Sequence, residues 1–161
     1  MKSTVVSDTT ALIVLSKLDQ FSLLSNVFER VVIPHIVYEE LTLKEAVILP
    51  SFFQIEPVLA QEITPDLLVL DAGEAQAIAL ASRLKLPLLI DEKKGRKIAQ
   101  HQGVAIFGTI GLIITNTQRG FISSDAALAL LDALASVNFR LSDTLKEQAK
   151  TQILRTLLPP N

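Results

Sequence analysis

Four acidic side chains stand where apolar, strand-like runs of this chain give way to helix-like segments. They are Asp8, Glu40, Glu74 and Asp91. Asp8 and Asp91 directly follow β-branched or leucine-rich runs, which are typical of buried parallel strands. The two glutamates fall in the first or second turn of amphipathic helices. Ligand sites of open α/β sheets lie outside the carboxyl ends of the strands, so we expect the four acids to meet there.

Acids brought together repel one another, and either protonation or a cation must relieve that repulsion. Mg²⁺ and Mn²⁺ are hard cations that prefer oxygen ligands. The four acids therefore predict a Mg²⁺ or Mn²⁺ site. Hydrolysis of phosphodiesters by metal-activated water is the leading hypothesis for its chemistry.

Two of the acids also have a plainer interpretation as ordinary helix residues. Asp8 could cap the helix that follows it, although Thr9 could take over that role and leave Asp8 for a metal. Glu40, with Glu39 beside it, could belong to a solvated helix face. The residues alone favour a metal ligand for Asp8 and a solvated helix face for Glu40.

A structural role accounts for the position of Glu74 better than for that of Asp91. Glu74 suits the positive end of a helix dipole, and Asp71 is assigned only a capping role before the helix that contains Gly73. Asp91 ends an apolar strand, where a charge seldom stands without a function. For Asp91 the functional interpretation is therefore favoured.

One local cluster of positive charge directly follows Asp91. A solvated helix face is its plain interpretation, but beside a metal site it would hold phosphates without reading sequence. Thr109 could donate its hydroxyl to a phosphate at a helix N-terminus, or simply cap that helix. Gly95 could allow a close backbone approach or merely weaken a short helix. The candidate nucleic-acid contacts are Thr9, Lys93, Lys94, Arg96, Lys97 and Thr109.

The composition is that of one apolar domain spanning residues 1–161. Hydrophobic residues make up 49% and the mean hydropathy is +0.41. A net charge of −2 gives no global attraction to nucleic acid, so any contact depends on a local patch. The absence of cysteine excludes thiol chemistry and is compatible with a reducing cytoplasm. The uncharged stretch from Ile98 to Gln118 contains glycines and is too short in its apolar part to span a membrane, so a soluble protein is expected.

Strands and helices alternate along the chain, as expected of an α/β fold. Strands are predicted at residues 4–6, 31–33, 88–90 and 104–107, with a possible strand at 55–58. Helices are predicted from residue 9, from 19 with Asp19 as cap, from 34, from 71 to 84, from 93 to 101 and from 108 to 117. Two C-terminal helices follow from about residue 123, at Ser123–Ala135 and Ser142–Leu158, each capped by its first serine.

Five segments, taken in order, resemble the PIN-domain nucleases, and more closely a bacterial and archaeal PIN-like, toxin-type group. The segments are SDTTALIVLSK, IPHIVYEEL, LDAGEAQAIALA, LLIDEKKGRKIA and VAIFGTIGLI. The resemblance implies a three-layer α/β/α domain with a central parallel sheet and a shallow acidic groove. It also implies Mg²⁺- or Mn²⁺-dependent cleavage of RNA, and a small antitoxin protein as partner.

The resemblance carries the family's acids onto particular positions of this chain. Asp8 matches the first acid, and Glu40, which precedes a leucine, matches the helix glutamate. Glu74 stands where most members have aspartate. Asp91 stands near the fourth acid, but IDEKKGR lacks the Thr-x-Asp pattern of the family, so Glu92 is an alternative to Asp91 as metal ligand.

Two other functions compete with metal-dependent ribonuclease activity. The missing Thr-x-Asp pattern and the acidic composition would suit a catalytically inactive PIN-like module that binds nucleic acid or a partner. An aspartyl-phosphate enzyme is weakly supported, because such enzymes usually carry a second aspartate at the position of Thr10. A homodimer is also expected, since the apolar helices around Ile13, Leu15, Phe21 and Phe28 suggest an additional buried surface.

Overall fold

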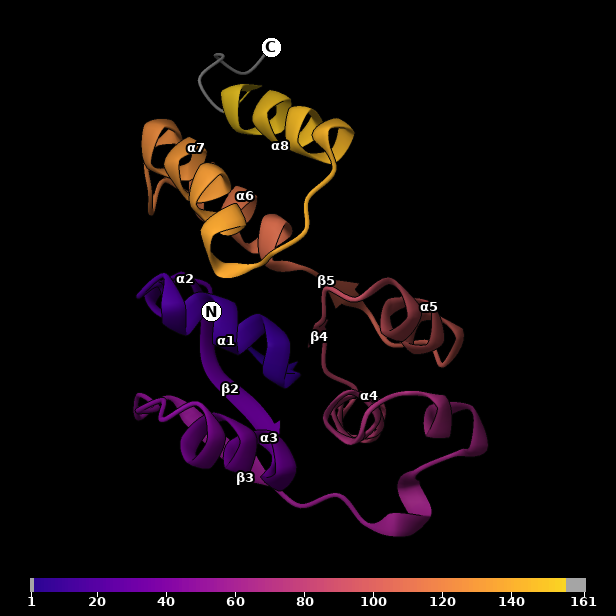
Figure 1. Cartoon of the computed structure of the whole chain (residues 1–161). Coiled ribbons are helices and arrows are strands. Elements are labelled where there is room, and N and C mark those ends of the chain that lie inside the picture. Colours follow the sequence, from indigo (N-terminus) through magenta and orange to yellow (C-terminus); the bar gives the residue numbers. More distant parts are fainter. Residues whose placement is uncertain (1, 156–161) are drawn as a thin grey trace.

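A five-stranded, fully parallel sheet forms the centre of the computed structural model, which describes residues 2–155 (Figure 1). The strand order is β3-β2-β1-β4-β5, and every neighbouring pair is parallel. The strands are β1 (Ser3–Ser7), β2 (Phe28–Pro34), β3 (Phe53–Glu56), β4 (Leu88–Leu89) and β5 (Ile106–Phe107). All five predicted strands are present. The third begins two residues earlier than expected, and the last two are shorter.

Alternation of side chains along the strands builds a core on each face of the sheet. Val5 and Leu89 point into one core, whereas their neighbours Val6 and Leu88 point into the other. All four are completely buried. Because apolar residues cover both faces, the sheet must lie between two helical layers, and the predicted three-layer α/β/α architecture is confirmed.

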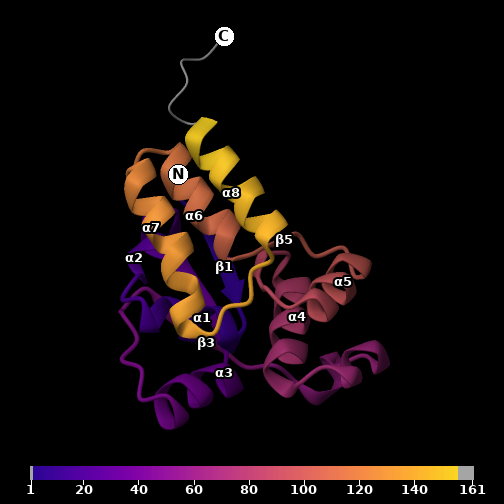
Figure 2. The same cartoon turned by 45° about the horizontal axis from the view of Figure 1, so that its top comes forward.

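The helices divide unevenly between the two faces. Residues of α1, α2, α3, α6, α7 and α8 join the first core, whereas α4 and α5 cover the second. Figure 2 shows α6, α7 and α8 lying together on one side of the molecule and α4 and α5 on the other. The α-helices are α1 (Thr9–Lys17), α2 (Ser22–Ser25), α3 (His35–Glu39), α4 (Ala72–Leu84), α5 (Lys93–His101), α6 (Thr109–Gln118), α7 (Ser124–Ala133) and α8 (Asp143–Arg155).

Short helical turns complete the chain. Helix α3 continues directly into η1 (Glu40–Lys44), a π-helical turn, and three 3₁₀ turns follow at η2 (Ala60–Glu62), η3 (Pro65–Val69) and η4 (Leu134–Val137). Within residues 2–155 no helix is both long and apolar enough to cross a lipid bilayer.

The predicted caps are partly correct. The hydroxyl of Ser123 accepts a hydrogen bond from the Ala126 amide, and that of Ser142 from the Leu145 amide, so both serines cap helices as expected. The assignment of Asp19 as a cap was wrong. Asp19 lies just after α1 at φ +54°, a left-handed conformation that often ends a helix and that aspartate tolerates. The predicted end of the last helix, at residues 156–158, falls outside the described residues.

The apolar residues that suggested a homodimer are used within the chain itself. Leu15 is fully buried and Phe28 nearly so. The Phe21 ring packs edge-on against Phe53, with 5.4 Å between ring centroids, and Ile13 also packs against the first core. These side chains therefore give no support to an additional interface, and the homodimer stays a prediction.

Candidate metal centre

Asp8 stands at the carboxyl end of the central strand β1 and is only 2% exposed. Its backbone N–H donates to the Leu89 carbonyl of the neighbouring strand β4. Its carboxylate accepts a hydrogen bond from the Ala11 amide at 3.3 Å and so caps α1. The expectation that Thr9 would take over the cap was wrong. The Thr9 hydroxyl is buried and has no hydrogen-bond partner.

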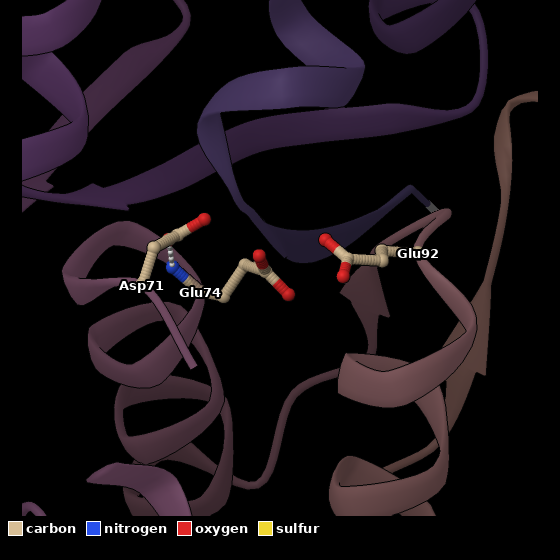
Figure 3. A group of neighbouring side chains, drawn as sticks. All are labelled: Asp71, Glu74 and Glu92. Atoms are coloured by element: carbon tan, nitrogen blue, oxygen red, sulfur yellow. Dashed lines mark hydrogen bonds between the residues drawn. The ribbon is translucent and has the colours of Figure 1, made fainter. Parts of the chain in front are cut away.

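Three further carboxylates meet at the same end of the sheet. One oxygen each of Asp71, Glu74 and Glu92 lies within 4.8 Å of the others. Figure 3 shows Glu74 between the other two, with Asp71 just before α4, Glu74 on its first turn and Glu92 just before α5. Asp71 caps α4 as predicted, since it accepts a hydrogen bond from the Glu74 amide at 2.8 Å.

Glu74 is the most enclosed member of this group, at 5% exposure. Its Oε2 atom is buried without a hydrogen-bond partner. A Cβ placed on Gly95 would lie 2.7 Å from this oxygen, closer than side chains can approach. Gly95 therefore permits α5 to pass against Glu74, which confirms the first of its two interpretations. A buried carboxylate oxygen without a partner is costly, and a cation bound beside it would remove that cost.

Glu40 reaches the same region from the π-helical turn η1. A Cβ on Gly73 would lie 3.3 Å from Glu40 Oε1, 3.5 Å from Asp71 Oδ1 and 3.1 Å from Thr9 Oγ1. These three polar groups therefore flank the same glycine. π-helical turns are frequent at functional sites, and here the turn begins at the acid that points toward the group.

Asp91 uses both of its oxygens to cap α6. Its Oδ1 accepts a hydrogen bond from the Thr109 amide at 2.8 Å, and its Oδ2 accepts one from the Thr109 hydroxyl at 2.7 Å. The Thr109 hydroxyl thus donates to Asp91, and the cap of α6 is the Asp91 carboxylate. Glu92, the predicted alternative, is the residue of this pair that joins Asp71 and Glu74.

Burial and mutual repulsion hold the acids away from their ionised forms. Burial, with smaller contributions from the charges of Asp91, Asp71 and Glu92, raises the pKa of Asp8 to about 7. Burial also raises the pKa of Glu74 to about 9, assisted by Asp71 and Glu92. The pKa of Asp91 is raised by burial as well. Clustered carboxylates with raised pKa values are typical of functional sites.

The donors of this group fit a hard divalent cation. All are carboxylate oxygens, which Mg²⁺ and Mn²⁺ prefer, and one of them is a buried atom that lacks any other partner. A cation at this position would remove both the repulsion and the unsatisfied oxygen. Asp71, Glu74 and Glu92 could hold the ion, with Asp8 and Glu40 adjacent.

The basic run lies on α5, directly after Glu92. Lys93, Lys94 and Lys97 are exposed, and the Lys94 ammonium donates to the Val69 carbonyl at 3.4 Å. Arg96 is half-buried, and its guanidinium donates to the Ile90 carbonyl at 2.7 Å. None of the four forms an ion pair within residues 2–155, so positive charge borders the acidic group.

A sequence-family model for a PIN domain matches residues 4–154. The chain belongs to the PIN-domain family. The matched span contains the whole sheet except Ser3 and every acid described above, and it confirms the resemblance drawn from the five segments. PIN nucleases act on nucleic acids and generally use divalent metals, and the acidic group supplies ligands of the kind such metals require. No functionally curated protein matches the chain.

The raised pKa of Asp8 makes the stability of the metal-free PIN domain depend on pH. Between the ordinary value of 3.8 and about 7, folded Asp8 holds a proton that unfolded Asp8 releases, so lowering the pH stabilises the fold. In chelator, the urea midpoint should therefore rise as pH falls from 9 to 5. At about 1.4 kcal/mol per pKa unit, Asp8 contributes about 3 kcal/mol of this rise between pH 7 and pH 5. Glu74, whose pKa is raised to about 9, contributes to the rise above pH 7.

Asp8→Asn should make this profile less steep between pH 4 and 7, where the raised pKa of Glu74 still contributes a slope of the same sign. It should also raise the midpoint at pH 8, because the neutral amide avoids the cost of burying a charge. Asp125→Asn, an exposed change on α7, is the control and should leave the profile unchanged. A wild-type midpoint that is constant from pH 5 to 9 would contradict the assignment.

Proposed function

We propose that this PIN domain is a metal-dependent endoribonuclease, acting in the cytoplasm as the toxin of a toxin–antitoxin pair. The observation that supports it most is the buried, unpartnered Oε2 of Glu74 within a group of carboxylates at the carboxyl ends of parallel strands. Binding sites of open α/β sheets lie at this edge, and a divalent cation satisfies that oxygen.

The acids divide into two roles in this proposal. Asp71, Glu74 and Glu92 would hold Mg²⁺ or Mn²⁺, with Asp8 beside them and Glu40 approaching the same group from η1. Asp91 fixes the start of α6 through Thr109 and so acts as a positioning residue. When bound, the metal would lower the pKa of a water molecule and offset the charge that develops on the phosphate.

The substrate is proposed to be single-stranded RNA held by α5. Lys93, Lys94 and Lys97 are exposed beside the acids, where they could contact phosphates on both sides of the cleaved bond. Phosphate contacts position the RNA strand but do not distinguish one base sequence from another. The small antitoxin and the toxin role rest on the resemblance of the five segments.

The direct test is cleavage of total cellular RNA and of a generic oligonucleotide by the purified protein. Cutting is expected with Mg²⁺ or Mn²⁺ and should stop with chelator. Total RNA is needed because a toxin-type nuclease can select a single RNA. RNA binding without cleavage of either substrate, with any divalent metal, would favour a catalytically inactive binding module. The hydrogen bonds that occupy both Asp91 oxygens suit that alternative.

A further inference from the structure

A cavity of about 580 Å³ opens beside the acidic group and is lined by residues of β5, α6 and α8. Asp91 and Arg96 form the end nearest the acids. A Cβ on Gly108 would lie 2.6 Å from Asp91 Oδ1 and 3.0 Å from Arg96 Nη1, so these groups are closely packed there. The charge of Asp91 contributes to the raised pKa of Asp8. Asp91 thus lines the cavity and directly precedes Glu92 of the acidic group.

The residues that line this cavity include aromatic residues, an arginine that could bind an anion, and two glutamines. Phe107 and Phe139 supply aromatic rings, and α8 contributes the amides of Gln148 and Gln152. Arg140 lies in the segment between α7 and α8, which passes close to β5 (Figure 2). Arg140 has no ion-pair partner in the part of the chain that the structure describes.

Charge and size narrow the choice of occupant. Asp91 is the single carboxylate that lines the cavity, and its oxygens are bonded to Thr109, so an anionic ligand meets little repulsion. The volume lies within the range of roughly 300–1,000 Å³ that is typical of small-ligand sites. Bases of single-stranded nucleic acid stack on aromatic side chains, and side-chain amides can donate to and accept from base edges.

We propose that this cavity receives one base of a single-stranded RNA, next to the phosphate that lies at the acidic group. The base stacks on Phe139, Gln148 and Gln152 contact its edge, and Arg140 binds the adjoining phosphate. This assignment rests on the proposed nuclease function for the position of the scissile phosphate. RNA is favoured over a protein segment for two reasons. Asp91, which lines the cavity, is the chain neighbour of Glu92 in the acidic group, and Arg140 has no ion-pair partner within residues 2–155.

The test measures RNA binding by fluorescence anisotropy in Ca²⁺, with two variants of the cavity and two matched controls. Phe139 also packs against the first core, so Phe139→Leu keeps an apolar side chain and removes only the ring. Arg140→Gln removes the charge. The controls are Phe121→Leu and Arg155→Gln, which change an exposed phenylalanine and an exposed arginine outside the cavity.

Phe139→Leu should weaken binding about tenfold, the size of one lost base stack, and the controls should not. An RNA with one abasic nucleotide at the bound position should bind wild type more weakly by a similar factor. In Phe139→Leu the abasic nucleotide should weaken binding no further, because the two changes remove the same stacking contact and are therefore not additive. Scanning the abasic nucleotide along the RNA locates that position.

The nuclease proposal and the base-cavity proposal fail in different ways. Unchanged binding by Phe139→Leu and Arg140→Gln, in a protein that still cleaves RNA with Mn²⁺, would overturn the base cavity alone and point to a protein segment as its occupant. Coupling between Phe139 and one abasic position, in a protein that never cleaves RNA, would support base binding in the cavity and contradict the proposed nuclease activity.

Discussion

Asp8→Asn is expected to lower metal-dependent RNA cleavage by about a hundredfold, since changes around metal ligands commonly cost 10–100-fold and this one removes a carboxylate next to the acidic group. The substitution keeps the shape of the side chain. Its amide oxygen can still accept the hydrogen bond from Ala11 that caps α1. Loss of cleavage would therefore reflect the missing charge and leave the fold intact, which circular dichroism and the urea midpoint would check.

The matched control for this substitution is Asp125→Asn, which removes an exposed carboxylate from α7 and should leave cleavage unchanged. In cells that lack an antitoxin, wild-type expression should slow growth and Asp8→Asn should restore it. Cleavage at the wild-type rate by folded Asp8→Asn would show that the reaction does not use this acid.

The second large effect is expected on RNA affinity when the exposed lysines of α5 are neutralised together. Substitution of glutamine for Lys93, Lys94 and Lys97 removes up to three phosphate contacts. For single strands each contact contributes about 0.7 to the slope of log affinity against log salt, so the slope should fall by about 2. At 0.1 M salt this corresponds to roughly a hundredfold weaker binding.

Arg96 is left out of this triple variant because its guanidinium also holds the Ile90 carbonyl. The matched control changes three exposed lysines elsewhere, Lys17, Lys44 and Lys85, and produces the same net charge. Equal losses of affinity in both triple variants would show that RNA responds to overall charge, and the assignment of α5 as the RNA-binding element would then be wrong.

The fold could be predicted from the sequence because the periods of its apolar residues differ between strands and helices. The apolar run in β1 and the leucine-rich run in β4 read as strands buried on both faces, and in the structure Val5 and Val6 point into opposite cores. The predicted ends of strands were less accurate, because hydrogen-bonded pairing with the neighbouring strands decides where a strand ends. Residue Ile90, predicted as strand, lies one residue beyond the two-residue β4.

The candidate site was predicted less completely, because sequence shows which acids stand at strand ends but gives no direction to their side chains. Asp71 was assigned to capping alone, yet its carboxylate both caps α4 and joins Glu74. Asp91 and Glu92 are neighbours in the chain, and only the hydrogen bonds from Thr109 distinguish their roles. A cap and a ligand can be one residue, as Asp8 and Asp71 both illustrate.

The most direct measurement is calorimetric titration of the protein with Mn²⁺ at pH 7.5, in two buffers of different ionisation enthalpy. Wild type should bind Mn²⁺ and release protons, because the ion displaces protons from acids whose pKa values are about 7 and about 9. Glu74→Gln and Glu92→Gln should each weaken binding by about tenfold or more, whereas Asp91→Asn should weaken it less. Absence of Mn²⁺ binding by wild type at millimolar concentration, or unchanged affinity in Glu74→Gln, would contradict a divalent-metal site at these carboxylates.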